Sequence, residues 1–233
     1  MKKITFLFLF SFSTFLLFSQ NIQLHYDLGK DRNYLTSTVE FFKADKLGST
    51  FFFVDMDYDV GEVKGISLAY WEIAREMNIG KSPLAAHIEY NGGFGRTTSS
   101  GYFGAYPIND AWLGGMAFNF NDKDFSKGLS FQLLYKYIRE KHDASFQLTA
   151  VWYVNLLKNK VTFSGYADFW REDNVFYSNT GERTTKFVFQ SEPQLWYNFT
   201  ENISLGTELE VGYNFVPVRG SRANPTIGAK WTF

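Results

Sequence analysis

The sequence contains no cysteine and only five prolines among its 233 residues. Without cysteine the chain has no disulfide, no thiolate metal site, no thiol nucleophile and no lipidated cysteine. Beyond residue 18 it also lacks an apolar run long enough to form a transmembrane helix. The formal net charge is −1, so there is no electrostatic case for nucleic acid as a partner.

What is present begins with a signal-peptide pattern. The first three residues are a basic start, residues 4–18 are apolar apart from Thr and Ser, and cleavage fits after Ser19 or Gln20. The alternative, an N-terminal anchor helix, is disfavoured because the run is short for a membrane span. We therefore expect residues 1–20 to be a signal peptide. Residues 21–233 are then exported, either as a soluble periplasmic protein or as an outer-membrane barrel.

Aromatic residues make up 20% of the chain, with 26 Phe and 14 Tyr, a composition that favours strands. Apolar and polar residues alternate in segments separated by polar or Gly-rich turns, and a period of two indicates strands with two different faces. No segment shows a convincing helical period over three turns. We expect twelve strands, at residues 21–28, 34–44, 48–58, 64–77, 83–94, 111–121, 128–139, 144–157, 160–171, 185–199, 202–215 and 225–233.

Two patterns favour a membrane barrel over a soluble β-sandwich. If both termini are periplasmic, the longest connections, 95–110, 172–184 and 216–224, all lie outside the cell, and those on the other side are mostly short. The chain also ends as an alternating strand whose last residue is Phe233, which resembles the signal read by the barrel assembly machinery. We therefore predict an all-β fold, a twelve-stranded transmembrane antiparallel β-barrel in the outer membrane, with the lipid bilayer and this machinery as partners.

The stretch from Tyr34 to Met77 resembles the opening hairpins of the Tsx-type nucleoside-specific channel family, and more closely still the uncharacterised Tsx-like barrels of the Bacteroidetes group. The matching elements are Tyr34-Leu35 leading to Glu40, Phe41-Phe42-Lys43, Asp45, the run Phe51-Phe52-Phe53 into Asp55, and Glu72-Ile73. The resemblance implies a twelve-stranded channel. It covers the first third of the chain well and the remainder mainly in architecture. The chain is shorter than the established channels, with smaller outer loops, so their substrate does not carry over.

The face opposite the apolar one carries many acids. Within residues 47–58, for example, Phe53, Asp55 and Asp57 share that face. An unpaired buried charge is costly, so carboxylates in a confined lumen must be hydrated, paired or protonated. Two interpretations remain open. The lumen is either a water-filled pathway or a narrow space filled by salt bridges.

The predicted function is passive uptake of small polar solutes through this lumen, with nucleosides the best guess. Carboxylates would accept hydrogen bonds from ribose hydroxyls, and an aromatic ring would stack on the base, which is worth roughly 1–3 kcal/mol per base. The residues expected to line the lumen and bind the solute are Phe53, Asp55, Asp57, Glu72, His87, Glu89, Tyr166, Asp168 and Glu192. No cofactor or metal is expected. The alternative is a non-transporting accessory or structural barrel that binds other outer-membrane proteins.

Catalysis is not expected. A twelve-stranded outer-membrane phospholipase needs Ser and His at matching depth on the lipid face. Here His25 and His87 fall on the inward face, and His142 lies in a short turn. The connection 95–110 allows two interpretations, since it could fold inward and constrict the mouth or remain solvated and contact a protein partner.

Overall fold

The computed structural model describes residues 18–30, 32–99, 102–141, 145–178 and 181–233. The strands are β1 Phe18–Asp27, β2 Leu35–Asp45, β3 Gly48–Tyr58, β4 Ile66–Asn78, β5 Leu84–Ser99, β6 Tyr102–Asn121, β7 Lys127–Ile138, β8 Ser145–Leu156, β9 Val161–Ser178, β10 Gly181–Ser191, β11 Gln194–Asn198, β12 Ile203–Tyr213 and β13 Ser221–Thr232. Most of the predicted signal peptide, and the predicted turn at His142, lie outside the described residues. The described part contains no helix long and apolar enough to cross a membrane.

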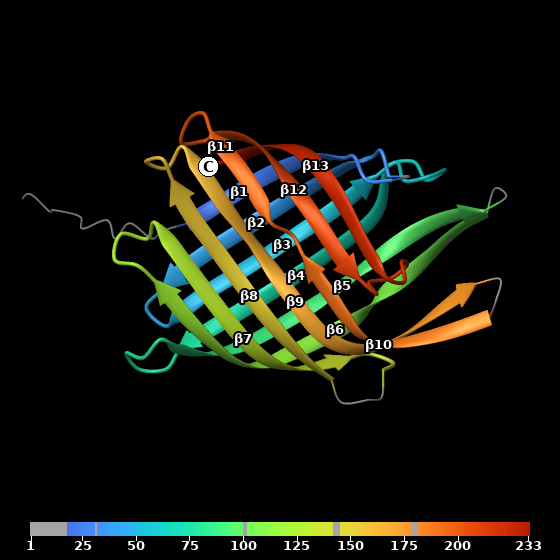
Figure 1. Cartoon of the computed structure of the whole chain (residues 1–233), viewed down its shortest axis with the longest axis horizontal. Coiled ribbons are helices and arrows are strands. Elements are labelled where there is room, and N and C mark those ends of the chain that lie inside the picture. The colour runs from blue at the N-terminus through green and yellow to red at the C-terminus, as the bar shows by residue number, and fades with distance from the viewer. Residues whose placement is uncertain (1–17, 31, 100–101, 142–144, 179–180) are drawn as a thin grey trace, which may run out of the picture.

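The strands close into a barrel (Figure 1) because β13 pairs with both β12 and β1, all antiparallel. β10 and β11 each pair with both β9 and β12, so together they occupy one strand position of the barrel wall, which is interrupted at Glu192 and Pro193. We call each strand position of the wall a stave. Proline has no N–H for the ladder, which is consistent with a break at this position. The 13 strands therefore form a closed barrel of twelve staves, and the predicted fold class is confirmed.

The two ends of the barrel differ. Asn21 pairs with Thr232, so the start of β1 and the end of β13 meet at one end, which we call the terminus end. Its connections are short, at residues 46–47, 79–83, 122–126, 157–160 and 199–202. In one of them the Ser126 hydroxyl donates a hydrogen bond to Asp122 and holds the pKa of this carboxyl below its usual range. The opposite end, which we call the hairpin end, carries longer connections and two projecting hairpins (Figure 1).

The stretches 95–110 and 172–184, expected as long loops, are largely strand. β5 continues to Ser99 and β6 begins at Tyr102, so these residues form an extended hairpin, and β9 and β10 form a second one. The glycines and the proline of residues 95–110 are typical of loops, so the sequence pattern did not indicate that this stretch forms paired strands. Tyr102 and Phe103 are 82% and 76% exposed, and the hairpin projects beyond the barrel (Figure 1). The expectation that this segment could constrict the mouth is wrong.

The alternation of side chains separates the two faces of the barrel as predicted. On β7, Leu133 and Tyr135 are 63% and 58% exposed and face outward, whereas Leu134 and Lys136 between and beyond them are buried and face inward. The outer face is rich in exposed apolar and aromatic side chains, which suits contact with lipid. Polar inward residues such as Gln23 are buried inside the barrel.

Replacing Gly48 with alanine is expected to destabilise the barrel. Gly48 follows the two-residue connection 46–47 with φ of +153°, and a Cβ there would lie 2.0 Å from the carbonyl oxygen of Glu76 on β4. We expect the free energy of unfolding to fall by about 1–3 kcal/mol, the usual cost of backbone strain. Urea titration of the folded, heat-modifiable gel band measures this change. Gly114→Ala is the matched control, because the nearest atom to its Cβ is 4.0 Å away, and an equal loss in both variants would contradict the explanation.

Candidate functional site

The nine residues predicted to line the lumen all occupy inward positions. Phe53, Asp55 and Asp57 share one face of β3, and Phe53 lies opposite Glu72 on β4. His87 and Glu89 lie on the next strand, with His87 opposite Glu76. Tyr166 and Asp168 come from β9, and Glu192 from the break between β10 and β11. The structure thus distributes the predicted set over two opposing walls.

Several inward carboxylates have no Lys, Arg or His within ion-pair distance among the described residues, and we call five of them the acidic belt: Asp55, Glu72, Asp168, Glu192 and Glu208. Each accepts a hydrogen bond from a neutral group instead. In the same order, the donors are Thr38 (2.5 Å), Tyr70 (2.6 Å), Thr149 (2.5 Å), Gln190 (2.9 Å) and Gln194 (2.6 Å). Neutral donors orient a carboxylate without cancelling its charge, so the belt remains able to attract cations.

The acidic belt spans a narrow lumen. Asp55 on β3 is within electrostatic range of Glu208 on β12 and of Glu192, although β2, β1 and β13 separate β3 from β12 in the sheet. Tyr166 on β9 is likewise within range of Glu72 on β4. Carboxylates that face each other repel, more strongly where less water separates them. Water or a cation between the two walls relieves this repulsion.

His87 and Glu89 bind each other. His87 Nε2 lies 3.0 Å from Glu89 Oε2, and His87 Nδ1 lies 3.4 Å from Glu76 Oε1. Glu76 also accepts a hydrogen bond of 2.6 Å from Asn119 Nδ2. The sequence placed these groups on the correct face, but the contact between His87 and Glu76 depends on the register between β4 and β5. Asp57, the remaining predicted acid, accepts a hydrogen bond of 2.7 Å from Thr36.

Arginines neutralise a second group of acids toward the hairpin end. Arg32, from the β1–β2 connection, forms ion pairs with Asp27 and Glu210, each at 2.6 Å. Arg222 on β13 forms an ion pair with the same Glu210. Sequence reasoning missed both arginines, because it placed one in a turn and the other in the connection 216–224, whereas β13 already begins at Ser221. Arg222 and Asn224 are two residues apart, on the face that the later inward residues of this strand share. This spacing was the signal in the sequence that could have placed Arg222 inside the barrel.

An inward apolar cluster occupies the same half of the barrel. We call it the apolar gate: Ala111, Leu113, Leu134, Ile138, Trp170 and Val188, with Phe215 packed against it. Phe215 comes from the connection 214–220, and its ring lies 5.9 Å from that of Trp170. Arg222 lies 4.9 Å from the Phe215 ring, which joins the gate to the arginine network. Thus the segment that enters the mouth is the β12–β13 connection, not the β5–β6 hairpin.

Trp196 fills the lumen nearer the terminus end. It is fully buried, with Lys230 Nζ 4.2 Å above its ring and the His25 ring 5.6 Å away. Glycines leave the room for these rings, since a Cβ at Gly206 would lie 2.6 Å from Trp196, and one at Gly228 would lie 2.9 Å from His25. The lumen is therefore narrow on both sides of the acidic belt.

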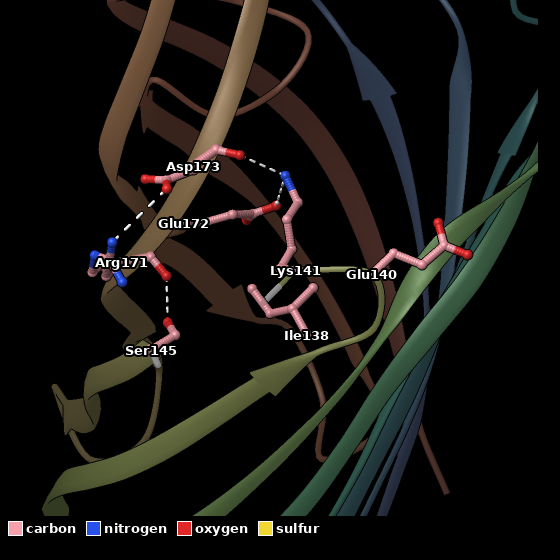
Figure 2. A pocket seen from close by; sticks show the side chains of 7 residues that line it. All are labelled: Ile138, Glu140, Lys141, Ser145, Arg171, Glu172 and Asp173. Atoms are coloured by element: carbon pink, nitrogen blue, oxygen red, sulfur yellow. Dashed lines mark hydrogen bonds and ion pairs between the residues drawn. The ribbon is translucent and has the colours of Figure 1, made fainter. Parts of the chain in front are cut away.

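A cavity of about 250 Å³ opens at the hairpin end beside the apolar gate. Figure 2 shows Lys141 reaching toward Glu172 (3.5 Å) and the backbone oxygen of Asp173 (2.6 Å), and Arg171 directed toward the Asp173 carboxylate (3.8 Å). Its acids and bases thus largely satisfy one another. Ile138 belongs to both the cavity and the gate, so the cavity adjoins the apolar gate.

A closed antiparallel barrel with an apolar outer face and a polar interior defines the class of transmembrane β-barrels found in outer membranes. Within that class, residues 19–233 match the family described as Domain of unknown function (DUF5020), and the chain belongs to this family. The comparisons provide no specific support for the resemblance to the Tsx family. A search of curated proteins finds no match.

Solved porin structures share the fold. The NanC porin is 10% identical, with a TM-score of 0.58, and the alignment covers 92% of this chain and 100% of that one. The KdgM porin in complex with disordered oligogalacturonate is also 10% identical, with a TM-score of 0.51 and coverage of 92% and 99%. At this identity the similarity establishes the outer-membrane porin fold and leaves the solute open.

Proposed function

We propose that the protein is an outer-membrane channel for passive uptake of small polar solutes. The acidic belt carries this proposal. Its carboxylates face one another without ion-pair partners, and such an arrangement is stable in the ionised form only where water or a cationic group reaches them. A hydrated pathway meets that requirement along the axis of the barrel.

We do not propose oligogalacturonate, the solute named in the KdgM complex, as the solute of this protein. An oligogalacturonate carries carboxylates, which the acidic belt would repel at short range. Among neutral solutes, nucleosides fit the lumen wall formed by β3 and β4 best. The Phe53 and Tyr70 rings, 6.0 Å apart, offer a surface for a base, and the adjacent Glu72 and Asp55 would accept hydrogen bonds from ribose.

Liposome swelling tests the proposal. We expect liposomes that contain the protein to take up a nucleoside faster than a neutral hexose, and to take up the corresponding nucleoside monophosphate slowest, because its phosphate meets the acidic belt. Liposomes without protein provide the baseline. Equal rates for the three solutes would contradict the nucleoside proposal, and no swelling with any of them would contradict the channel.

The apolar gate favours a second candidate, a non-transporting barrel that binds other membrane proteins. Its side chains, together with the arginine network, fill much of the lumen toward the hairpin end. Planar-bilayer recording separates the two candidates. Discrete conductance steps support the channel, whereas a silent barrel that copurifies with a defined membrane partner supports the accessory role.

A further inference from the structure

Two buried oxygens beside Glu72 have no hydrogen-bond donor. Glu89 and Asn91 are 7% and 4% exposed, and Glu89 Oε1 and Asn91 Oδ1 are both unpartnered. Glu89 is a carboxylate, so its orphaned oxygen is an acceptor in either orientation of the group. A buried acceptor without a donor costs free energy, and this wall contains two of them.

The neighbouring strands explain why no donor is present. Glu89 lies between Ala74 on β4 and Leu113 on β6, and neither has a polar side chain. Asn91 lies between Glu72 and Ala111, which likewise offer no donor when Glu72 is ionised. The β5–β6 register shifts immediately after Asn91, and bulges of this kind often re-aim side chains at functional sites.

The local charge balance is negative. Glu72 is within electrostatic range of Glu89 and of Asp168 on the opposite wall. Two cationic side chains lie nearby. Lys136 lies in range of these acids, but its ammonium is already engaged, 2.7 Å from Gln147 Oε1 and 4.3 Å from the Trp170 ring. His87 is held between Glu89 Oε2 at 3.0 Å and Glu76 Oε1 at 3.4 Å. The nearby cations therefore donate no hydrogen bond to Glu89 Oε1 or Asn91 Oδ1. They also leave part of the negative charge of the surrounding carboxylates unbalanced.

We propose that Glu72, Glu89 and Asn91 form a subsite for the ammonium head of an organic amine. The inference rests on the channel function proposed above, because the amine must reach the belt through the lumen. A primary ammonium presents three N–H donors on one centre, and the acceptors lie within about 7 Å of one another, two residues apart along β5 or directly opposite on β4. Leu113 and the ring of Tyr70 flank them and suit an alkyl body or a cation–π contact.

Block of potassium current tests this subsite in planar bilayers containing the full chain. We expect n-butylammonium to block at a concentration about tenfold or more below that of tetramethylammonium, which has the same charge but no N–H donor. n-Butanol, which lacks the charge, should block less than n-butylammonium. Equal block by the two cations would overturn the proposal, since charge alone would then explain it.

The variants Glu89→Gln and Glu76→Gln form a matched pair. Each removes one carboxylate that contacts His87, but Glu76 already accepts from Asn119, and only Glu89 carries an orphaned oxygen. We expect half-block by n-butylammonium to need about tenfold more amine in Glu89→Gln and to change little in Glu76→Gln. Asn91→Val, checked for folding by heat-modified gel migration, should weaken block in the same direction. The same weakening in Glu76→Gln would overturn the subsite.

Calorimetric titration of n-butylammonium into the detergent-solubilised protein separates this inference from the channel proposal. A barrel that conducts nothing but binds the amine, with binding lost in Glu89→Gln, retains the subsite and contradicts the channel. A conducting barrel that does not bind the amine retains the channel and overturns the subsite.

Discussion

Phe215→Ala is expected to raise single-channel conductance several-fold. Phe215 is the part of the apolar gate that comes from a connection rather than from a stave, and it packs against Trp170 across the mouth. Removing its ring widens the constriction and lets water enter, and hydrophobic constrictions control conduction through wetting. Planar-bilayer recording in symmetric KCl measures the change.

Val218→Ala provides the control for this prediction. Val218 lies on the same connection, 214–220, but is 38% exposed and is not part of the apolar gate. Conductance should be unchanged in this variant. If Phe215→Ala conducts no better than the parent protein while its gel migration shows a folded barrel, the gate does not limit the pathway.

Neutralising three of the five carboxylates of the acidic belt is expected to weaken cation selectivity. In the triple variant Asp55→Asn, Glu192→Gln, Glu208→Gln, three carboxylates that couple across the lumen lose their charge and keep their shape. Rings of Asp and Glu select cations because their potential is strongest in a confined, poorly screened space. The reversal potential in a KCl gradient should move from a cation-selective value toward zero.

A charge-matched control removes three exposed acids outside the lumen, with Glu62→Gln, Glu182→Gln and Glu201→Gln. The reversal potential of this variant should stay close to that of the parent, because exposed charges are screened by salt over about 10 Å at 0.1 M. Equal loss of selectivity in both triple variants would assign it to net charge, and anion selectivity in the parent protein would reject the role of the belt.

The sequence was sufficient for the fold and for the orientation of the lining residues. Strict alternation decides which face each side chain occupies, and Phe53, Asp55 and Asp57 could be placed from residues 47–58 alone. A period of two also predicts an inward Lys136 and Trp170. These features depend on local pattern, and local pattern is what a single sequence records.

Features that depend on long-range contacts were not predictable in the same way. Arg32 meets Glu210, and Phe215 meets Trp170, only after twelve staves have closed and two connections have folded into the mouth. The hydrogen bond between His87 and Glu89 depends on rotamers as well as on face. Nothing in the spacing of these residues distinguishes a paired carboxylate from a free one.

The two projecting hairpins give this protein free β-edges, which a closed barrel otherwise abolishes. Beyond Gly95, β5 has no pairing with β4, and before Ala111, β6 has none with β7, so one flank of each extension is open. Open edges invite strand-to-strand self-association, which charges and prolines discourage. Arg96 and Pro107 lie on the first hairpin, and Glu182 and Arg183 lie on the second. Their placement makes the hairpins poor templates for aggregation where they leave the barrel.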